Sequence, residues 1–132
     1  KEGVTASSKL PDSIFVRGYR KGDVLVSNIR PYFKKIWQAD RDGGCSNDVL
    51  VIRAKQELDP AFLYYLLSEG GFFDFTMATA TGTKMPRGDK NAIMRYKVPN
   101  IDLKNQVRIA EFLSAIDGKI VLNKKINHHL FF

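Results

Sequence analysis

Residues 22–32 read GDVLVSNIRPY, and this stretch does most to decide the predicted fold. Residues 23–29 alternate and are rich in Val and Ile, which predicts a β-strand. Pro31 ends the strand because proline has no N–H to donate to a ladder. Asp48-Val49-Leu50-Val51 repeats the pattern of Asp23-Val24-Leu25-Val26, so residues 48–53 are expected to form a second strand. Two occurrences indicate a sheet and not a repeat protein, which needs about three units.

The remaining short elements follow from local signals. Asp59-Pro60 predicts a helix start, with Asp as the N-cap and Pro in the first turn, and Gly70-Gly71 are expected to stop that helix. Residues 72–78 are predicted to continue as a short helix. We further expect a strand at 13–17, a turn at 40–47, a loop at 79–91, and a strand or extended chain at 94–98.

Residues 105–130 give the strongest helix prediction. Their apolar residues recur at alternating spacings of four and three, which is the pattern of a coiled-coil seam. The seam positions are Ile109, Leu113, Ile116, Ile120, Asn123, Asn127 and Leu130. Asparagine in a seam lowers stability but specifies register and partner. The alternative is an apolar stripe that packs on the chain's own domain, with the two asparagines at its solvated end.

The composition bounds the class of protein. A chain of 132 residues with 44% hydrophobic residues suits one domain with a core. The longest apolar run, residues 62–67, is far shorter than the roughly 20 residues that span a bilayer. Residues 1–4 do not resemble a signal peptide, and the chain is expected to begin partway through a larger protein because residue 1 is not Met. The single cysteine, Cys45, excludes an internal disulfide and a multi-cysteine zinc site, and fits the cytoplasm.

The net charge of +7 is concentrated in two places. Residues 79–104 carry six Lys or Arg and two Asp or Glu, and residues 1–58 carry eleven and seven, with a basic cluster around residues 26–36. Residues 59–78 contain three acidic residues and no Lys or Arg. A basic face suggests a polyanionic partner, most often nucleic acid, although a merely basic protein would show the same charge.

Known catalytic motifs do not fit these segments. Asn28-Ile29-Arg30-Pro31-Tyr32 resembles the Asn-Pro-Pro-Tyr loop of adenine-N6 methyltransferases, but Ile and Arg replace its second and third residues. No glycine-rich loop follows a strand to hold a methyl donor. Residues 82–90 lack the Gly-Lys-Ser/Thr ending of a phosphate loop. His128 and His129 are adjacent on the predicted helix and point apart, so they cannot chelate one metal. We predict no catalytic residues, no metal and no cofactor.

The two basic segments remain as candidates for DNA binding. Lys and Arg neutralise phosphates, an arginine such as Arg30 or Arg87 can also bond guanine bidentately, and threonine hydroxyls can donate to phosphate oxygens. The predicted DNA-binding residues are Asn28, Arg30, Tyr32, Lys34, Lys35, Thr81, Thr83, Lys84, Arg87 and Lys90. Tyr32 and Phe33 are expected to divide between a DNA-facing position and a core position. A solvated basic loop is the alternative at this point.

The order of five motifs identifies a family. The chain resembles the specificity subunit of type I restriction–modification systems, specifically the later part of one target recognition domain and the conserved helix that follows. The matching segments are Gly22–Tyr32 (similar to "GDIL-S-IRPY"), Cys45–Ile52, Phe62–Ser68 ("FLYYLL"), Gly82–Arg87 ("GSTMPR") and Val98–Asp117 ("P…EQ-RIA–L–ID").

This resemblance implies an α+β fold: a twisted, mostly antiparallel sheet with flanking helices and a long C-terminal helix of the coiled-coil type. Residues 1–100 would be a target recognition domain that lacks part of its N-terminal region, and 101–132 half of an antiparallel coiled coil. The implied function is non-catalytic recognition of double-stranded DNA for methyltransferase subunits and, through them, a restriction subunit. Its second recognition half would be another domain or a second copy.

Two alternatives stay open. The first is the recognition domain of a single-chain adenine methyltransferase–nuclease, and the second is a helical protein–protein adaptor without a DNA role.

Overall fold

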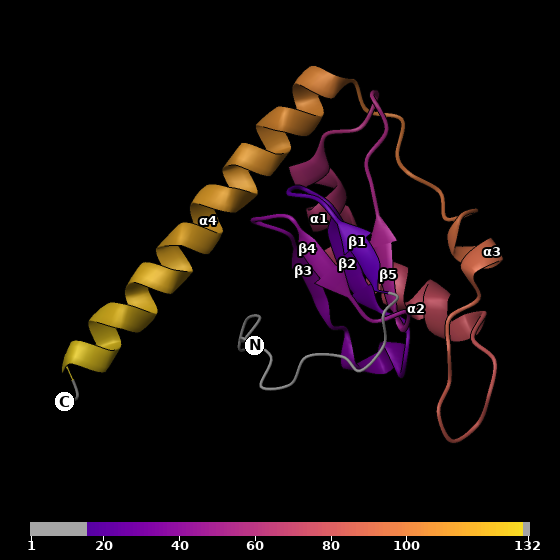
Figure 1. Ribbon diagram of the computed structural model, residues 1–132. Coiled ribbons are helices and arrows are strands. Elements are labelled where there is room, and N and C mark those ends of the chain that lie inside the picture. The colour runs from indigo at the N-terminus through magenta and orange to yellow at the C-terminus, as the bar shows by residue number, and fades with distance from the viewer. Residues whose placement is uncertain (1–15, 131–132) are drawn as a thin grey trace.

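The computed structural model describes residues 16–130. Five short strands are followed by four helices, and a 3₁₀ helix lies between the second and third strands (Figure 1). The strands are β1 (Arg17–Tyr19), β2 (Val24–Ser27), β3 (Ile36–Gln38), β4 (Gly43–Cys45) and β5 (Val49–Ile52). The helices are η1 (Pro31–Phe33), α1 (Pro60–Ser68), α2 (Gly70–Ala78), α3 (Lys90–Ile93) and α4 (Leu103–Leu130).

The strands form two antiparallel sheets in place of the single sheet that was expected. β2 is the centre of a three-stranded sheet, where Leu25 lies opposite Trp37 of β3 and Val51 of β5. β1 pairs with β4 in a separate two-stranded sheet. The Tyr19 ring packs edge-on against Trp37 at 5.8 Å, and thereby joins the two sheets. The predicted α+β class with antiparallel strands and a long C-terminal helix is confirmed.

Several short elements differ from the sequence prediction. The first strand lies at 17–19, and residues 13–15 are outside the described part. The predicted turn at 40–47 contains β4, and β3 was not predicted because three residues beside two lysines give little pattern. The loop predicted at 79–91 ends in helix α3, and residues 94–98 form no strand because Met94 and Arg95 close α3 by hydrogen bonds to Lys90 and Ala92.

The core lies between the three-stranded sheet and the helices. Figure 1 shows α1 and α2 against one side of the strands. The cluster of buried apolar side chains consists of Val24, Val26, Leu50, Leu63, Leu67, Phe72, Phe73 and Ile93. Val24 and Val26 alternate along β2 and therefore point to the same face of the sheet, toward the helices. Leu25, on the opposite face, is buried too, so the pattern of residues 23–29 predicts the strand but does not distinguish its two faces.

The first helix begins where the sequence predicts. The Asp59 side chain accepts a hydrogen bond of 2.9 Å from the N–H of Phe62, which caps the N-terminus of α1. Helix α1 ends at Ser68, but Gly70 and Gly71 do not act only as a stop, because they form the first turn of α2. Extended backbone at Glu69 separates the two helices and lets the chain change direction.

An ion pair between a buried carboxylate and a half-exposed guanidinium joins the start of β2 to the chain after β5. The carboxylate of Asp23 is 3% exposed and accepts hydrogen bonds of 2.8 and 2.6 Å from Arg53. It also accepts from the N–H of Arg20 at 2.8 Å. The hydrogen bonds from the Arg53 guanidinium hold the pKa of Asp23 below its usual range. Asp23 in the GDVLV stretch therefore fixes the edge of the domain as well as starting a strand.

Helix α4 leaves the domain after its first turns (Figure 1). Gln106 and Ala110 are buried against the domain, Leu113 is half-buried, and Asp117 accepts a hydrogen bond of 2.8 Å from Tyr65 of α1. These residues are four, three and four apart and lie on one face. No described side chain beyond residue 117 of α4 is buried. Within residues 16–130 no helix combines the length and apolarity needed to cross a bilayer.

Candidate nucleic-acid interface

The fold brings the two basic segments together. The turn at residues 28–35, which we call the arginine turn, pairs with the loop at 81–90, which we call the threonine loop. Ile29 and Arg87 form an antiparallel bridge. Its hydrogen bonds run from the N–H of Arg30 to the carbonyl of Pro86 at 2.9 Å and from the N–H of Gly88 to the carbonyl of Asn28 at 3.3 Å. Segments about 50 positions apart in the sequence thus form one surface.

The threonine loop is a small hairpin. Thr81 and Arg87 exchange both backbone hydrogen bonds, at 2.9 and 3.0 Å. Gly82 takes a positive φ of 94°, which a residue with a side chain rarely adopts, and this conformation closes the tip. Thr83, Lys84 and Met85 at the tip are exposed. The hairpin therefore presents a hydroxyl and a cation to solvent on a braced backbone.

The arginine turn is strained at both ends. Arg30 and Lys34 flank the 3₁₀ helix η1 and both have φ of 50°, in the left-handed region that ordinary side chains disfavour. Pro31 is buried, whereas Tyr32 and Phe33 are 48% and 54% exposed. The expectation that one of the two aromatic residues is a core anchor is therefore wrong, because Pro31 fills that position. Strain of this kind persists where surrounding contacts enforce it, and it is often found at functional sites.

The exposed rings lie among cations. The Tyr32 and Phe33 ring centroids are 4.7 Å apart, and Lys35 Nζ lies 5.8 Å from the Phe33 centroid. Of the predicted DNA-binding residues, those with exposed side chains are Arg30, Tyr32, Lys35, Thr81, Thr83, Lys84, Arg87 and Lys90. Lys34 is half-buried. An exposed surface of cations, hydroxyls and aromatic rings has the chemistry of nucleic-acid binding proteins.

Asn28 differs from the other candidates because it is only 6% exposed. Its N–H donates to the carbonyl of Asp48 at 2.9 Å, and its Oδ1 is buried without a hydrogen-bond partner among the described residues. A Cβ at Gly88 would lie 2.8 Å from this oxygen and 2.8 Å from Thr76 Cγ2. Asn28 therefore supports the junction of the two segments from beneath, and Gly88 is required there by close packing.

Asp48 is a site residue that the sequence did not indicate. Its Oδ1 accepts a hydrogen bond of 2.9 Å from Arg87 NH1, and the two side chains are 42% and 50% exposed. The residues are 39 positions apart. No short motif links them, so only the pairing of β2 with β5 and of Ile29 with Arg87 brings the carboxylate to the guanidinium.

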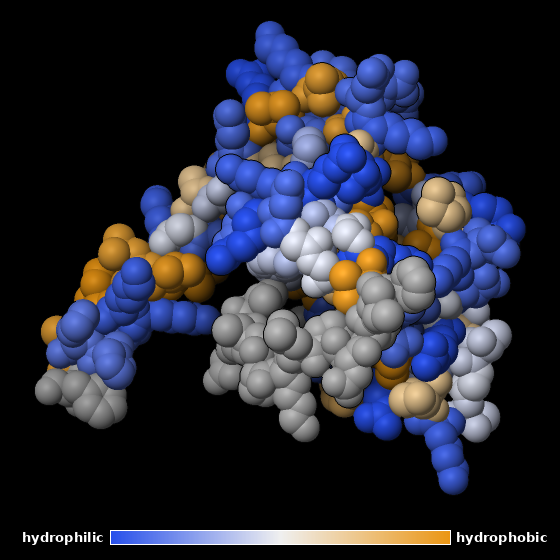
Figure 2. Space-filling model, in the orientation of Figure 1, coloured by the Kyte–Doolittle hydropathy of each residue, from blue (hydrophilic) through white to orange (hydrophobic). Residues whose placement is uncertain are grey.

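A second surface lies on α4. Its exposed apolar side chains include the predicted seam residues Ile109, Ile116, Ile120 and Leu130, and Asn123 and Asn127 are also exposed. Phe112 and Ile126, outside the predicted seam, are 68% and 46% exposed and broaden this apolar face. Leu113 lies beside the residues that pack on α1. Figure 2 shows apolar side chains gathered along the part of α4 that extends away from the domain.

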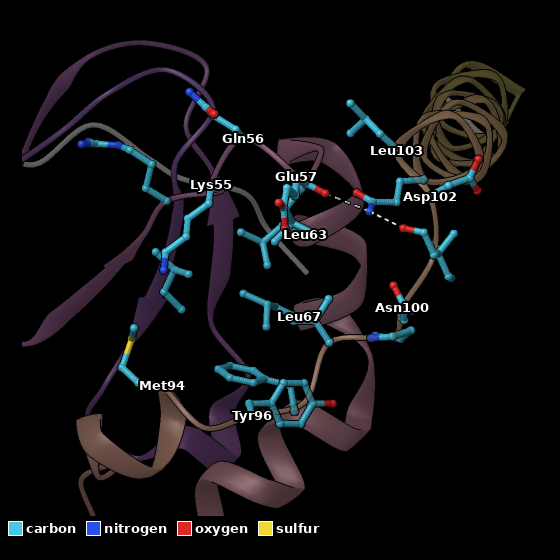
Figure 3. A pocket seen from close by; sticks show the side chains of 18 of the residues that line it. Lys55, Gln56, Glu57, Leu63, Leu67, Met94, Tyr96, Asn100, Asp102 and Leu103 are labelled. Carbon is cyan, nitrogen blue, oxygen red and sulfur yellow. Dashed lines mark hydrogen bonds between the residues drawn. The ribbon is translucent and has the colours of Figure 1, made fainter.

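A cleft of about 740 Å³ separates α1 from the chain that leads into α4 (Figure 3). The side chains of Leu63 and Leu67 line one wall, and Met94, Tyr96 and residues 98–103 form another. At one end Gln106 Nε2 donates to the carbonyls of Glu57 and Ile101 at 3.1 and 2.7 Å, shown as dashed lines. The cleft is mostly apolar. Among residues 16–130 no three His, Cys, Asp or Glu side chains converge as metal ligands.

Comparison with known proteins shows the family and the fold of this chain. Residues 19–130 match the family model of the type I restriction modification DNA specificity domain. Over 112 residues the chain is 31% identical to the type I restriction enzyme EcoDI specificity subunit of Escherichia coli. The aligned region covers 83% of this chain and 24% of that subunit. The chain thus spans about a quarter of the length of this curated relative.

Two solved structures are similar in fold. The crystal structure of the HsdS subunit from Thermoanaerobacter tengcongensis superposes with a TM-score of 0.68 at 28% identity, covering 82% of this chain and 29% of that one. The second is a chain from a structure that concerns the structural basis of complex assembly and conformational transition of the type I R-M system. It superposes with a TM-score of 0.67 at 27% identity, and the match covers 83% of this chain and 30% of that one.

Proposed function

Because this chain belongs to the type I restriction modification DNA specificity domain family, we propose that it recognises a specific double-stranded DNA sequence. Its role is non-catalytic and cytoplasmic. It directs adenine methylation and DNA cleavage that partner methyltransferase and restriction subunits carry out. This chain covers 24% of the length of the E. coli relative.

The observation that carries the proposal is the joined surface of the arginine turn and the threonine loop. The Ile29–Arg87 bridge holds exposed cations from both segments on one braced scaffold. Cations such as Arg30 and Lys84 neutralise phosphates and release counterions, and hydroxyls such as Thr83 bond phosphate oxygens. Surfaces on fixed backbone present donors with the small positional error that base recognition requires.

The exposed face of α4 supports a further part of the proposal, which is that α4 pairs with a helix of a partner. An apolar stripe on a helix that leaves its domain needs a partner, and exposed apolar residues spaced by three and four favour another helix. We propose antiparallel pairing with the helix of a second recognition half, either in the same chain or in a second copy. This pairing would set the distance between two DNA half-sites.

A selection from random duplexes tests the proposal. The full-length protein is combined with its methyltransferase subunit, and bound duplexes are recovered and sequenced. We expect an enriched half-site that this domain contacts. The double variant Arg30→Glu/Lys84→Glu should abolish the enrichment, because both charges face the proposed DNA surface. The control Lys125→Glu changes an exposed charge on distant α4 and should keep it. No enriched half-site with the wild-type protein would overturn the proposal.

A further inference from the structure

Arg87 has the most constrained backbone of the exposed cations in the two segments. It lies between two neighbouring chain segments, since it forms one bridge with Ile29 and another with Thr81. Its own N–H and carbonyl both bond Thr81. The carbonyl of Pro86 before it and the N–H of Gly88 after it bond the arginine turn. The Cα of Arg87 therefore has little freedom to move.

The Arg87 side chain is held as well. Arg87 NH1 donates to Asp48 Oδ1 at 2.9 Å. Asp48 is itself fixed, because its carbonyl accepts from the N–H of Asn28 at 2.9 Å and its N–H donates to Ser46 Oγ at 3.2 Å. Half of the Arg87 side chain remains exposed. Since a guanidinium has five N–H donors, the donors that do not bond Asp48 can reach a ligand.

This pairing favours a base contact over a phosphate contact. A phosphate is attracted chiefly by net charge, and Asp48 cancels the charge of Arg87 and would repel a nearby phosphate. A base edge is recognised by the direction of donors, which Asp48 fixes. Arg30 is different, because among the described residues its side chain has no hydrogen-bond or ion-pair partner and keeps its full charge.

We propose that Arg87 reads a guanine in the major groove of the target and that Asp48 is the residue that positions it. Arginine matches guanine because two parallel N–H donors meet O6 and N7 of that base. The proposal rests on the DNA recognition proposed above and adds the base, the reading residue and its support. Asp48 does not touch DNA in this arrangement and acts through Arg87.

The test measures affinities for the selected half-site and for each of its single-base-pair variants. The full-length protein with its methyltransferase subunit is used throughout. Arg87→Ala should lower discrimination at one G·C pair by about 10- to 100-fold and leave the other positions unchanged. Asp48→Asn should lower discrimination at the same pair severalfold, while affinity for unrelated duplex stays the same or rises because a repulsive charge is lost.

Two controls separate this role from general electrostatics. Lys84→Ala removes an exposed cation from the same loop and should lower the affinity for all duplexes by the same factor. Asp40→Asn breaks the exposed Asp40–Arg41 ion pair away from the loop and should change neither affinity nor discrimination. Exposed ion pairs add little stability, so thermal unfolding should show all four variants folded.

The outcomes distinguish the two proposals. Arg87→Ala could instead weaken binding to every duplex equally and lower the slope of log affinity against log salt by about 0.9. That result would make Arg87 a phosphate contact and overturn the inference, while the proposed DNA recognition would stand. Unchanged discrimination in Asp48→Asn overturns the positioning role of Asp48. A wild-type protein that selects no half-site overturns both this inference and the proposed function.

Discussion

The backbone N–H of Asp59 donates a hydrogen bond of 2.9 Å to Oε1 of Gln106, which is 47 positions later in the chain. Asp59 caps α1, and Gln106 lies in the first turns of α4 and is 3% exposed. The amide nitrogen of the same glutamine donates to the carbonyls of Glu57 and Ile101. One side chain thus ties the start of α1 to the start of α4 and fixes where α4 leaves the domain.

Replacing this glutamine should loosen the junction. Gln106→Leu keeps the volume but leaves the Asp59 N–H and two carbonyls without partners, so we expect the free energy of unfolding to fall by about 2–3 kcal/mol. Hydrogen exchange should rise first at the N-terminus of α1. The control Lys104→Ala changes an exposed residue nearby and should have little effect. Urea unfolding of the full-length protein measures the stability of both variants. Equal stability of Gln106→Leu and wild type would show that the Gln106 hydrogen bonds do not hold α1 and α4 together.

Two glycine substitutions should have opposite effects. Gly88→Ala places a methyl group 2.8 Å from Asn28 Oδ1 and 3.0 Å from Ile93 Cδ1, so we expect lower stability and weaker DNA selection. Gly118→Ala places a methyl group in open space within α4 and should raise helix stability by about 0.5–1 kcal/mol. Thermal unfolding compares the pair. A neutral Gly88→Ala would show that the two segments are not closely packed there.

The hydrogen bond from Tyr65 of α1 to Asp117 of α4 should be lost at alkaline pH. Burial, and then the hydrogen bond to Asp117, raise the pKa of Tyr65 to about 12 from the usual 10. A raised pKa in the folded state means that the Tyr65 contribution is complete below pH 10 and is lost as pH rises toward 12. Tyr65→Phe should therefore be less stable at neutral pH, by about 1 kcal/mol.

The stability difference between wild type and Tyr65→Phe should then shrink between pH 10 and 12. Chemical unfolding of both proteins across this range measures the difference, so that other titrating groups cancel. A difference that stays constant up to pH 12 would show that Tyr65 does not hold α4 through Asp117.

Charge on the exposed face of α4 should block pairing of the helix. Ile116→Asp combined with Ile120→Asp places two carboxylates in the apolar stripe, where burial against a partner would be costly. We expect loss of assembly with the second recognition half, while the domain itself stays folded because neither residue contacts the core. Lys125→Asp lies on the opposite side of the helix and serves as the matched control.

Sedimentation and methyltransferase co-purification read out this assembly. Normal assembly of the Ile116→Asp/Ile120→Asp protein would place the interface on another face. Failure of both double and control variants to assemble would point instead to damage of the helix.

Local signals in the sequence determined the elements with strong patterns. Asp59-Pro60 fixed the start of α1, because capping and a preset proline φ act within a few residues. The spacing of apolar residues predicted α4, and the alternation in residues 23–29 predicted β2. The order of five motifs sufficed to identify the family. Short strands such as β3 and β4 were missed because three residues carry almost no periodic signal.

Only the tertiary structure decided which basic residues lie on one surface and which of them are fixed by hydrogen bonds to other residues. Arg87 pairs with Asp48 across 39 positions of the chain. The burial of Asn28 and the exposure of both Tyr32 and Phe33 likewise follow from the packed fold and from no local pattern. Periodicity and capping report energies within one turn or strand, whereas these contacts arise when packing of the core brings the strand ends and loops together. The sequence therefore determined that two basic segments exist, and the packed fold decided that they form one surface.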